Sequence, residues 1–236
     1  MSETITCTTR DNVAVITLDD GKVNAMTLPF FESLGGALDR AEQDGAGALV
    51  ITGRPGAFSA GLNLKVLPTL PPEELRRTLT AFGKTMLRVF TFPLPTIAAV
   101  SGHAIAGGAM LAFACDLRHL ADGAFRLHLN ETAIGLPLPT WAIMMGQSAV
   151  PNRWHTAALL HARAYTPAEA LERGIADAVV PPERLLDGAL AAAAPLAALD
   201  RAAYATSKAR HRAMAVEWAE ARIQPELVGP TPGASR

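Results

Sequence analysis

The sequence predicts an α/β fold with a mainly parallel sheet, followed by a helix-rich C-terminal part. Three observations predict it: short apolar runs rich in β-branched residues alternate with amphipathic helical segments, glycine-containing loops follow those runs, and an alanine-rich pattern occupies the end of the chain. Alternating strands and helices form βαβ units, because parallel strands need a crossover connection. With 236 residues, of which 50% are hydrophobic and 18% charged, the chain is long enough to bury a substantial core.

The first half of the chain supplies most of the predicted sheet. NVAVITLDDG predicts a strand at about 13–18, and TLPFFESLGGALDRAEQDG predicts a helix with Thr27 as its cap and Pro29 in its first turn. GALVITGRPG is a compact apolar strand, and TIAAVSG is another. A helical stretch from Pro72 to Phe92 separates the two.

The second half is richer in helices. TPAEALERGIADAVVP predicts a capped helix, a stop at Gly174 and a strand that reaches Val180. The alanine-rich pattern from 183 to 224, interrupted by Pro195, fits either a terminal helical cap or an arm that forms an oligomer. The predicted organisation is a core with the functional site at 1–185, a helical oligomerisation or lid region at 186–225, and a disordered tail at 226–236.

Composition excludes several classes of function. The formal net charge of −1 does not favour a nucleic-acid partner. Cys7 and Cys115 are too few and too far apart for a disulfide framework, so we expect two free thiols and a cytoplasmic protein without a secretion signal. The uncharged stretch between Arg88 and Asp116 is long enough to span a bilayer, but its prolines and glycines favour a buried strand, a turn and a buried helix. We therefore expect no membrane segment.

Two glycine-containing loops, GRPGAFSAGLNLK and SGHAIAGG, each follow a predicted strand. Ligands of open parallel sheets bind where strands end and loops begin. Gly107 and Gly108 open a helix, whose first N–H groups lack intrahelical partners and attract negative charge. A second N–H from the Gly61 loop would complete a two-donor site for an enolate or oxyanion, although a glycine pair also serves close packing. The six histidines are scattered, so no metal site is expected.

Three blocks resemble the signatures of the crotonase, or enoyl-CoA hydratase/isomerase, superfamily: AFSAGLNLK at 57–65, SGHAIAGGAMLAFACDLR at 101–118 and LNETAIGLPLP at 129–139. VNAM near the N-terminus and YTPAEALERGIADAVVP fit the same pattern, so the resemblance covers nearly the whole chain. It implies a ClpP-like spiral of ββα units with a C-terminal helical region, assembled as a homotrimer or a dimer of trimers. It also implies acyl-CoA substrates of fatty acid metabolism and no cofactor, because coenzyme A is part of the substrate.

Matching these blocks residue by residue assigns roles in the site. The family's oxyanion donors fall on the backbone N–H groups of Leu62 and Gly107, and its acid/base glutamate on Glu131. The substrate-binding positions are expected at Ala25, Ala60, Gly61, Asn63, Gly108, Met110 and Lys208. Asn63 replaces a common aspartate, which puts a charge at that position in doubt but not the neighbouring donor. Lys208 either binds the nucleotide phosphates of coenzyme A or belongs to a solvated basic helix face.

The resemblance also distinguishes two reactions. Family hydratases use two glutamates, but Met110 occupies the position of the first, and only Glu131 matches the second. A longer segment between Phe125 and Glu131, with Trp141 beyond it, is similar to the mitochondrial-type Δ3,Δ2-enoyl-CoA isomerases. One base suffices for isomerisation, and the apolar neighbours of Glu131 suit a raised carboxyl pKa. We therefore predict an isomerase; the alternatives are a hydratase or other one-base enzyme of this family, and a non-catalytic acyl-CoA-binding paralogue.

Overall fold

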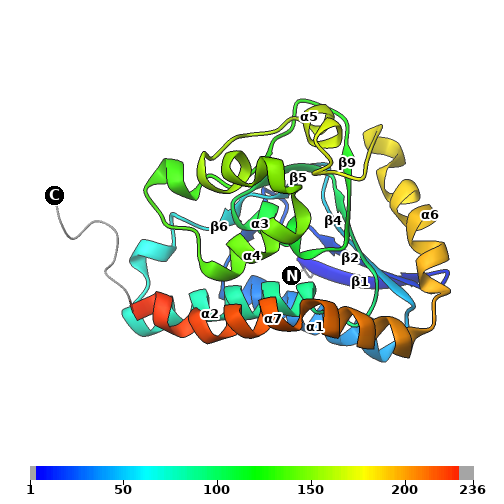
Figure 1. Ribbon diagram of the computed structural model, residues 1–236, viewed down its shortest axis with the longest axis horizontal. Helices are drawn as coiled ribbons and strands as arrows, with labels where there is room; N and C mark the ends of the chain where they lie inside the picture. The colour runs from blue at the N-terminus through cyan, green and yellow to red at the C-terminus, as the bar shows by residue number, and fades with distance from the viewer. Residues whose placement is uncertain (1–3, 229–236) are drawn as a thin grey trace.

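The computed structural model describes residues 4–228, in which a six-stranded sheet has helices on both of its faces (Figure 1). Its strand order is β1 (Ile5–Arg10), β2 (Val13–Leu18), β4 (Ala48–Gly53), β7 (Thr96–Val100), β9 (Leu117–Ala121) and β11 (Ala178–Val180). Only the β1–β2 pair is antiparallel. Asp11 and Asn12 join these two strands with positive φ angles of 45° and 66°, as a tight hairpin turn requires. The predicted mainly parallel sheet is confirmed.

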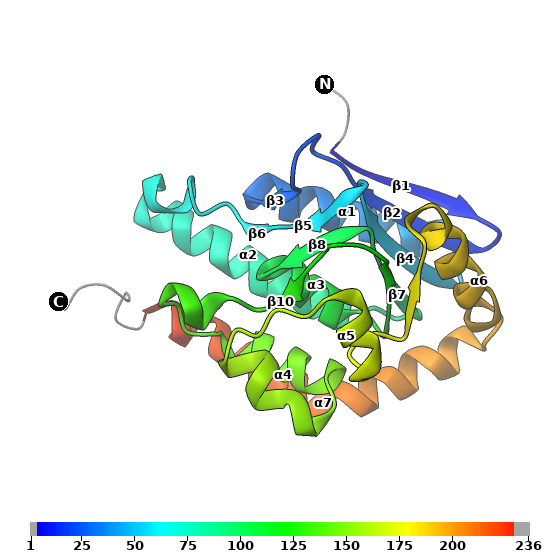
Figure 2. The same cartoon turned by 90° about the horizontal axis from the view of Figure 1, so that it is seen from above.

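Two smaller parallel sheets lie beside the main one, as the view from above shows (Figure 2). The first contains β10 (Leu127–His128), β8 (Gly102–Ile105) and β5 (Gly56–Ser59), and the second pairs β3 (Ala25–Met26) with β6 (Gly61–Leu62). Strands β4 and β5 precede one helix, and strands β7 and β8 precede the next. This repeated strand–strand–helix unit confirms the predicted α/β spiral.

The helices divide between two cores. The α-helices of the described residues are α1 (Leu28–Gln43), α2 (Pro72–Phe90), α3 (Gly107–Ala114), α4 (Thr140–Ala149), α5 (Pro167–Glu172), α6 (Leu185–Ala197) and α7 (Arg201–Val228). Short helical turns occur at Leu67–Thr69, Glu131–Ile134, Asn152–Trp154, Thr156–Leu160 and Pro182–Arg184. Helix α6 packs on one face of the sheet against Val13, Val15 and Ile97, whereas α1 to α4 and part of α7 enclose the larger core on the other face.

The predicted strands and helices occur close to the expected positions, with differences at the ends of elements. Thr27 precedes α1 without a side-chain capping bond, whereas Thr166 and Glu169 form a complete capping box at α5. Pro195 does not interrupt the helix where it stands; it lies in the last turn of α6, which ends at Ala197. In the described part of the chain no helix is long and apolar enough to cross a bilayer. Both cysteines are free thiols.

The predicted disordered tail at 226–236 begins too early. Helix α7 continues to Val228, while 229–236 lie outside the described residues. The reason is a long-range contact: the Glu226 carboxylate accepts hydrogen bonds from the backbone N–H (2.9 Å) and the hydroxyl of Thr140, at the start of α4. This contact holds the end of α7 against α4, and the polar, proline-rich composition of the tail does not reveal it.

A buried ionic cluster fixes α7 to the core. Asp116, directly after α3 and the loop residue Cys115, accepts hydrogen bonds from Lys208 Nζ (2.7 Å), Arg212 Nη2 (2.7 Å) and the Tyr204 hydroxyl (2.8 Å) of α7. Burial by itself would raise the pKa of Asp116, but Lys208 and Arg212 outweigh it and hold the pKa below its ordinary value. The cluster therefore contains an ionised carboxylate that joins α3 to the terminal helix.

Replacing Asp116 with Asn should destabilise the protein by about 3 kcal/mol or more, because it leaves the buried ammonium of Lys208 without its counter-ion. Urea unfolding followed by circular dichroism measures this loss. Glu73→Gln is the matched control, since Glu73 forms an exposed pair with Arg76 and its removal should leave the urea midpoint nearly unchanged. Equal stability of the Asp116 and Glu73 variants would contradict a structural role for the cluster.

Candidate active site

A pocket of about 720 Å³ lies where the β6 loop, α2, α3, the start of α4 and the end of α7 meet. Leu75, Leu79 and Phe82 of α2 form one wall, and apolar side chains of α3, α4 and α7 form much of the rest. Phe82 and Trp141 pack edge to face with ring centroids 4.8 Å apart. Among residues 4–228 no three His, Cys, Asp or Glu side chains gather in a metal-binding arrangement. The pocket therefore fits an apolar ligand with few polar contacts.

The backbones of Gly61 and Gly107 approach each other closely at one side of the pocket. Gly61 has a φ of +78°, and a Cβ atom placed on it would lie 2.7 Å from the Gly107 nitrogen. Gly107 is the first residue of α3, so its N–H has no partner inside the helix. Ala106 has a φ of +52°, a conformation rare for alanine, at the turn from β8 into α3. The two loops that the sequence predicted to be neighbours are thus in contact.

The Leu62 amide completes the arrangement. In the short β3–β6 pair, the next amide along, that of Asn63, donates to the Met26 carbonyl at 3.0 Å. Hydrogen-bonding direction alternates along a strand, so the Leu62 N–H is directed away from β3. Leu62 and Gly107 both line the pocket. Two backbone donors at one wall form an arrangement able to stabilise an oxyanion.

Glu131 is the buried carboxyl group of the pocket. It starts a short helical turn after β10, and the Leu136 N–H donates to its carbonyl at 2.9 Å. The residue is 8% exposed, and its Oε2 has no hydrogen-bond partner within the described structure. Burial raises the pKa of this carboxyl. A buried, unpaired carboxyl with a raised pKa is suited to accept and return a proton.

Asn130 is a pocket residue that the sequence did not single out. Its Oδ1 is buried and lacks a hydrogen-bond partner among the described residues, and it lines the same pocket as Glu131. The available signal was its position directly before the glutamate in LNETAIG. The type of residue alone does not reveal this role, because asparagine is equally common in turns.

Five of the ten predicted site residues line the pocket together: Ala60, Leu62, Gly107, Met110 and Glu131. Met110 is 2% exposed, and its thioether side chain is apolar. Ala25 and Gly61 pair in the β3–β6 sheet behind the wall, and the Asn63 side chain accepts from the Lys65 N–H at 3.2 Å. These residues support the site from behind rather than line it.

Two predicted binding residues are corrected by their surroundings. A Cβ atom on Gly108 would lie 2.1 Å from the Ser59 carbonyl oxygen, so this glycine allows α3 to pack on β5 and does not face the pocket. Lys208 does not reach the pocket either, because its buried ammonium donates to Asp116 and to the Leu94 carbonyl at 3.0 Å. A lysine engaged in this way is not available to bind coenzyme A phosphates. The basic residues of α7 do not reveal, in the sequence alone, that Asp116 packs against Lys208.

Comparison with known proteins agrees with this geometry. Residues 8–226 match the family described as enoyl-CoA hydratase/isomerase. Human mitochondrial enoyl-CoA delta isomerase 1 is 34% identical over 203 residues, which are 85% of this chain and 67% of the relative. A putative enoyl-CoA hydratase of Thermus thermophilus is 37% identical over 197 residues, 80% of this chain and 76% of that protein. The solved structure of an enoyl-CoA isomerase from Mycobacterium tuberculosis superimposes with a TM-score of 0.90 at 34% identity, covering 98% of this chain and all of that one.

Replacing Gly108 with Ala should destabilise the protein by about 1–3 kcal/mol, because the added methyl group meets a backbone carbonyl that cannot move without shifting β5. Thermal unfolding measures the effect. Gly36→Ala is the matched control: Gly36 lies inside α1 with open space around its Cβ position, and alanine there should be neutral or stabilise by up to about 1 kcal/mol. A Gly108→Ala protein as stable as wild type would contradict the packing role.

Proposed function

Because this chain belongs to the enoyl-CoA hydratase/isomerase family, we propose that it is a Δ3,Δ2-enoyl-CoA isomerase, which moves the double bond of an acyl-CoA from position 3 to position 2. The single observation that carries the proposal is a pocket with one buried carboxyl, Glu131, in whose lining Met110 is an apolar side chain. Glu226 also lines this pocket, but it is exposed and its carboxylate is bound to Thr140. The available chemistry is therefore that of one base.

The proposed reaction is a proton transfer that begins and ends at the same carboxyl. The Glu131 carboxylate removes a proton from C2, and the electron pair of that C–H bond moves onto the thioester carbonyl to form an enolate. The N–H groups of Leu62 and Gly107 donate to the enolate oxygen and lower its free energy. The Glu131 carboxylic acid then protonates C4 while the carbonyl re-forms and the double bond appears between C2 and C3. No proton is exchanged with another residue, so a second acid is not needed.

Hydration of a 2-enoyl-CoA is the second candidate, because the relative from Thermus thermophilus is named a putative enoyl-CoA hydratase. Water addition needs a group to activate the water and a group to supply the proton at C2. The apolar side chain of Met110 supplies neither. Another one-base reaction on the same enolate, or a non-catalytic acyl-CoA-binding protein, would use the same pocket.

One assay distinguishes these candidates. The enzyme is incubated separately with 3-enoyl-CoA and 2-enoyl-CoA, and the conjugated thioester is followed by absorbance while products are separated by chromatography. Rapid formation of 2-enoyl-CoA supports the isomerase. Hydroxyacyl-CoA as the faster product contradicts it in favour of a hydratase, and tight acyl-CoA binding without turnover indicates a binding protein.

The assembly is part of the same proposal. We propose a homotrimer or a dimer of trimers, in which the C-terminal helical region contributes to subunit contacts. Exposed apolar side chains on α7, Met214 and Trp218, are consistent with contact to a partner. Sedimentation velocity of the full chain tests the assembly, and a monomer at micromolar concentration would contradict it.

Glu131→Gln should lower kcat by at least about a hundredfold, because the amide cannot take up the C2 proton. Its similar shape should leave the Kd for a saturated acyl-CoA nearly unchanged. Steady-state kinetics and isothermal titration calorimetry give the two values. Glu183→Gln, which changes an exposed carboxyl in the turn before α6, serves as the control and should keep full activity. Full activity of the Glu131 variant would remove this residue from the mechanism.

The pH dependence should report the raised pKa of Glu131. The base must be ionised, so kcat/KM falls as the pH drops through the pKa of the folded enzyme. Burial places that pKa above the ordinary glutamate value of about 4.3, so the acidic limb of the kcat/KM profile should lie above that value. A limb at or below the ordinary value, measured over a range where the protein stays folded, would show that another group controls the reaction.

A further inference from the structure

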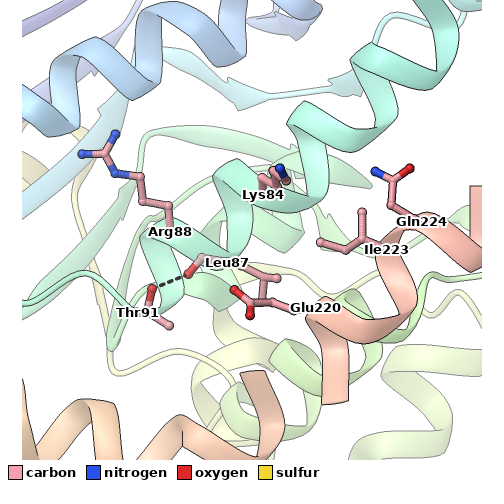
Figure 3. Close-up of a pocket in the computed structure, with 7 residues that line it drawn as sticks. All are labelled: Lys84, Leu87, Arg88, Thr91, Glu220, Ile223 and Gln224. Atoms are coloured by element: carbon pink, nitrogen blue, oxygen red, sulfur yellow. Dashed lines mark hydrogen bonds between the residues drawn. The ribbon is translucent and has the colours of Figure 1, made fainter. Parts of the chain in front are cut away.

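The side chain of Ile223, in α7, lines two hollows of the molecule. One is the pocket described above, and the other is a groove of about 560 Å³ between α2 and α7 (Figure 3). The groove is lined by Lys84, Leu87, Arg88, Thr91, Glu220, Ile223 and Gln224. Ile223 is the residue common to both linings, and it is 6% exposed. Its side chain is therefore part of the wall that the two hollows share.

A glycine in α2 makes this wall tight. A Cβ atom on Gly83 would lie 3.1 Å from Trp141 Nε1 and 3.3 Å from Ile223 Cδ1. The missing side chain lets Trp141 and Ile223 pack directly against the backbone of α2. Phe82 and Trp141, next to this contact, are 5% and 4% exposed. The pocket is closed at this end.

Another part of the pocket lining is exposed to solvent. Leu64, Ile134 and Leu136 line it there and are 52%, 46% and 38% exposed. No lysine or arginine is among the described residues of the lining, so the charged nucleotide of coenzyme A finds no cation inside. An acyl-CoA would therefore keep its nucleotide at the exposed side and direct its apolar chain toward the closed end, where Ile223 lies.

We propose that Ile223 sets the acyl-chain length that the pocket accepts, by forming its end wall. The inference rests on the proposed acyl-CoA substrate and adds the residue that selects among such substrates. Beyond the wall, the groove lining includes Leu87, which is 4% exposed, together with Lys84, Arg88 and Glu220. Shortening Ile223 should join the two hollows and let a longer chain pass between α2 and α7.

The test measures binding of saturated acyl-CoAs, from hexanoyl- to hexadecanoyl-CoA, to wild type and Ile223→Ala by isothermal titration calorimetry. Each added methylene should tighten binding about fourfold while it is buried in the pocket. For wild type the tightening should stop where the chain meets Ile223. In Ile223→Ala it should continue for roughly three further methylenes, the number of side-chain carbons removed, each again worth about fourfold.

Three further variants keep the test decisive. Ile223→Val removes one methyl group with less disturbance of packing and should move the limit by about one methylene, which decides the question if the alanine variant does not fold. Leu227→Ala lowers apolar contact in the pocket but not in the groove, so it should weaken binding without moving the limit. Gln224→Ala changes the groove alone and should leave wild-type binding unaltered.

Each outcome decides either the inference or the function on which it rests. An unchanged limit in folded Ile223→Ala and Ile223→Val overturns the role of Ile223, whatever the enzyme catalyses. A shifted limit without isomerisation by wild type supports the inference and overturns the isomerase. Absence of acyl-CoA binding to wild type overturns both.

Discussion

The contact between the backbones of Gly61 and Gly107 is the constraint on which the site depends. Two strand-ending loops, far apart in the sequence, can place their amides at one wall only if neither carries a side chain at the point of contact. Gly61 has a positive φ, which turns the chain at the start of β6. As a glycine it also has no Cβ atom that would meet the Gly107 backbone. The chemistry of the pocket thus begins with backbone atoms that the parallel sheets hold in register.

Helix α3 connects the backbone contact at Gly107 with the terminal helix α7. Its first amide, that of Gly107, has no partner inside the helix, and Gly108, one residue on, lets the helix pack against β5. Just beyond its C-terminal end, Asp116 binds Lys208 and Arg212 of α7. The same terminal helix carries Ile223 into the pocket wall. A charge cluster remote from the reacting atoms therefore positions the surface against which a substrate chain would lie.

The placement of Glu131 shows how little polar machinery the pocket contains. Its carboxyl is buried among apolar side chains, with an oxygen that no described group binds. An ionised carboxylate is less stable there than in water, which raises its pKa and makes the neutral acid accessible during a reaction. Met110 adds a buried apolar side chain to the same lining, and Glu226, the other carboxylate there, is exposed and bound to Thr140. The pocket thus combines one buried carboxyl with a largely apolar lining.

The sequence by itself determined the alternation of strands and helices and the glycine loops, because these depend on local periodicity and turn chemistry. The resemblance of its short motifs to the family added Glu131 and the two backbone donors as predictions. Tertiary structure alone decided that Gly108 packs against Ser59, that Lys208 is bound to Asp116, that Glu226 belongs to a helix, and that Ile223 lines the pocket. Each of these depends on a contact between segments distant in the chain. Neither the type of a residue nor its neighbours in the sequence indicate which distant segment will pack against its side chain.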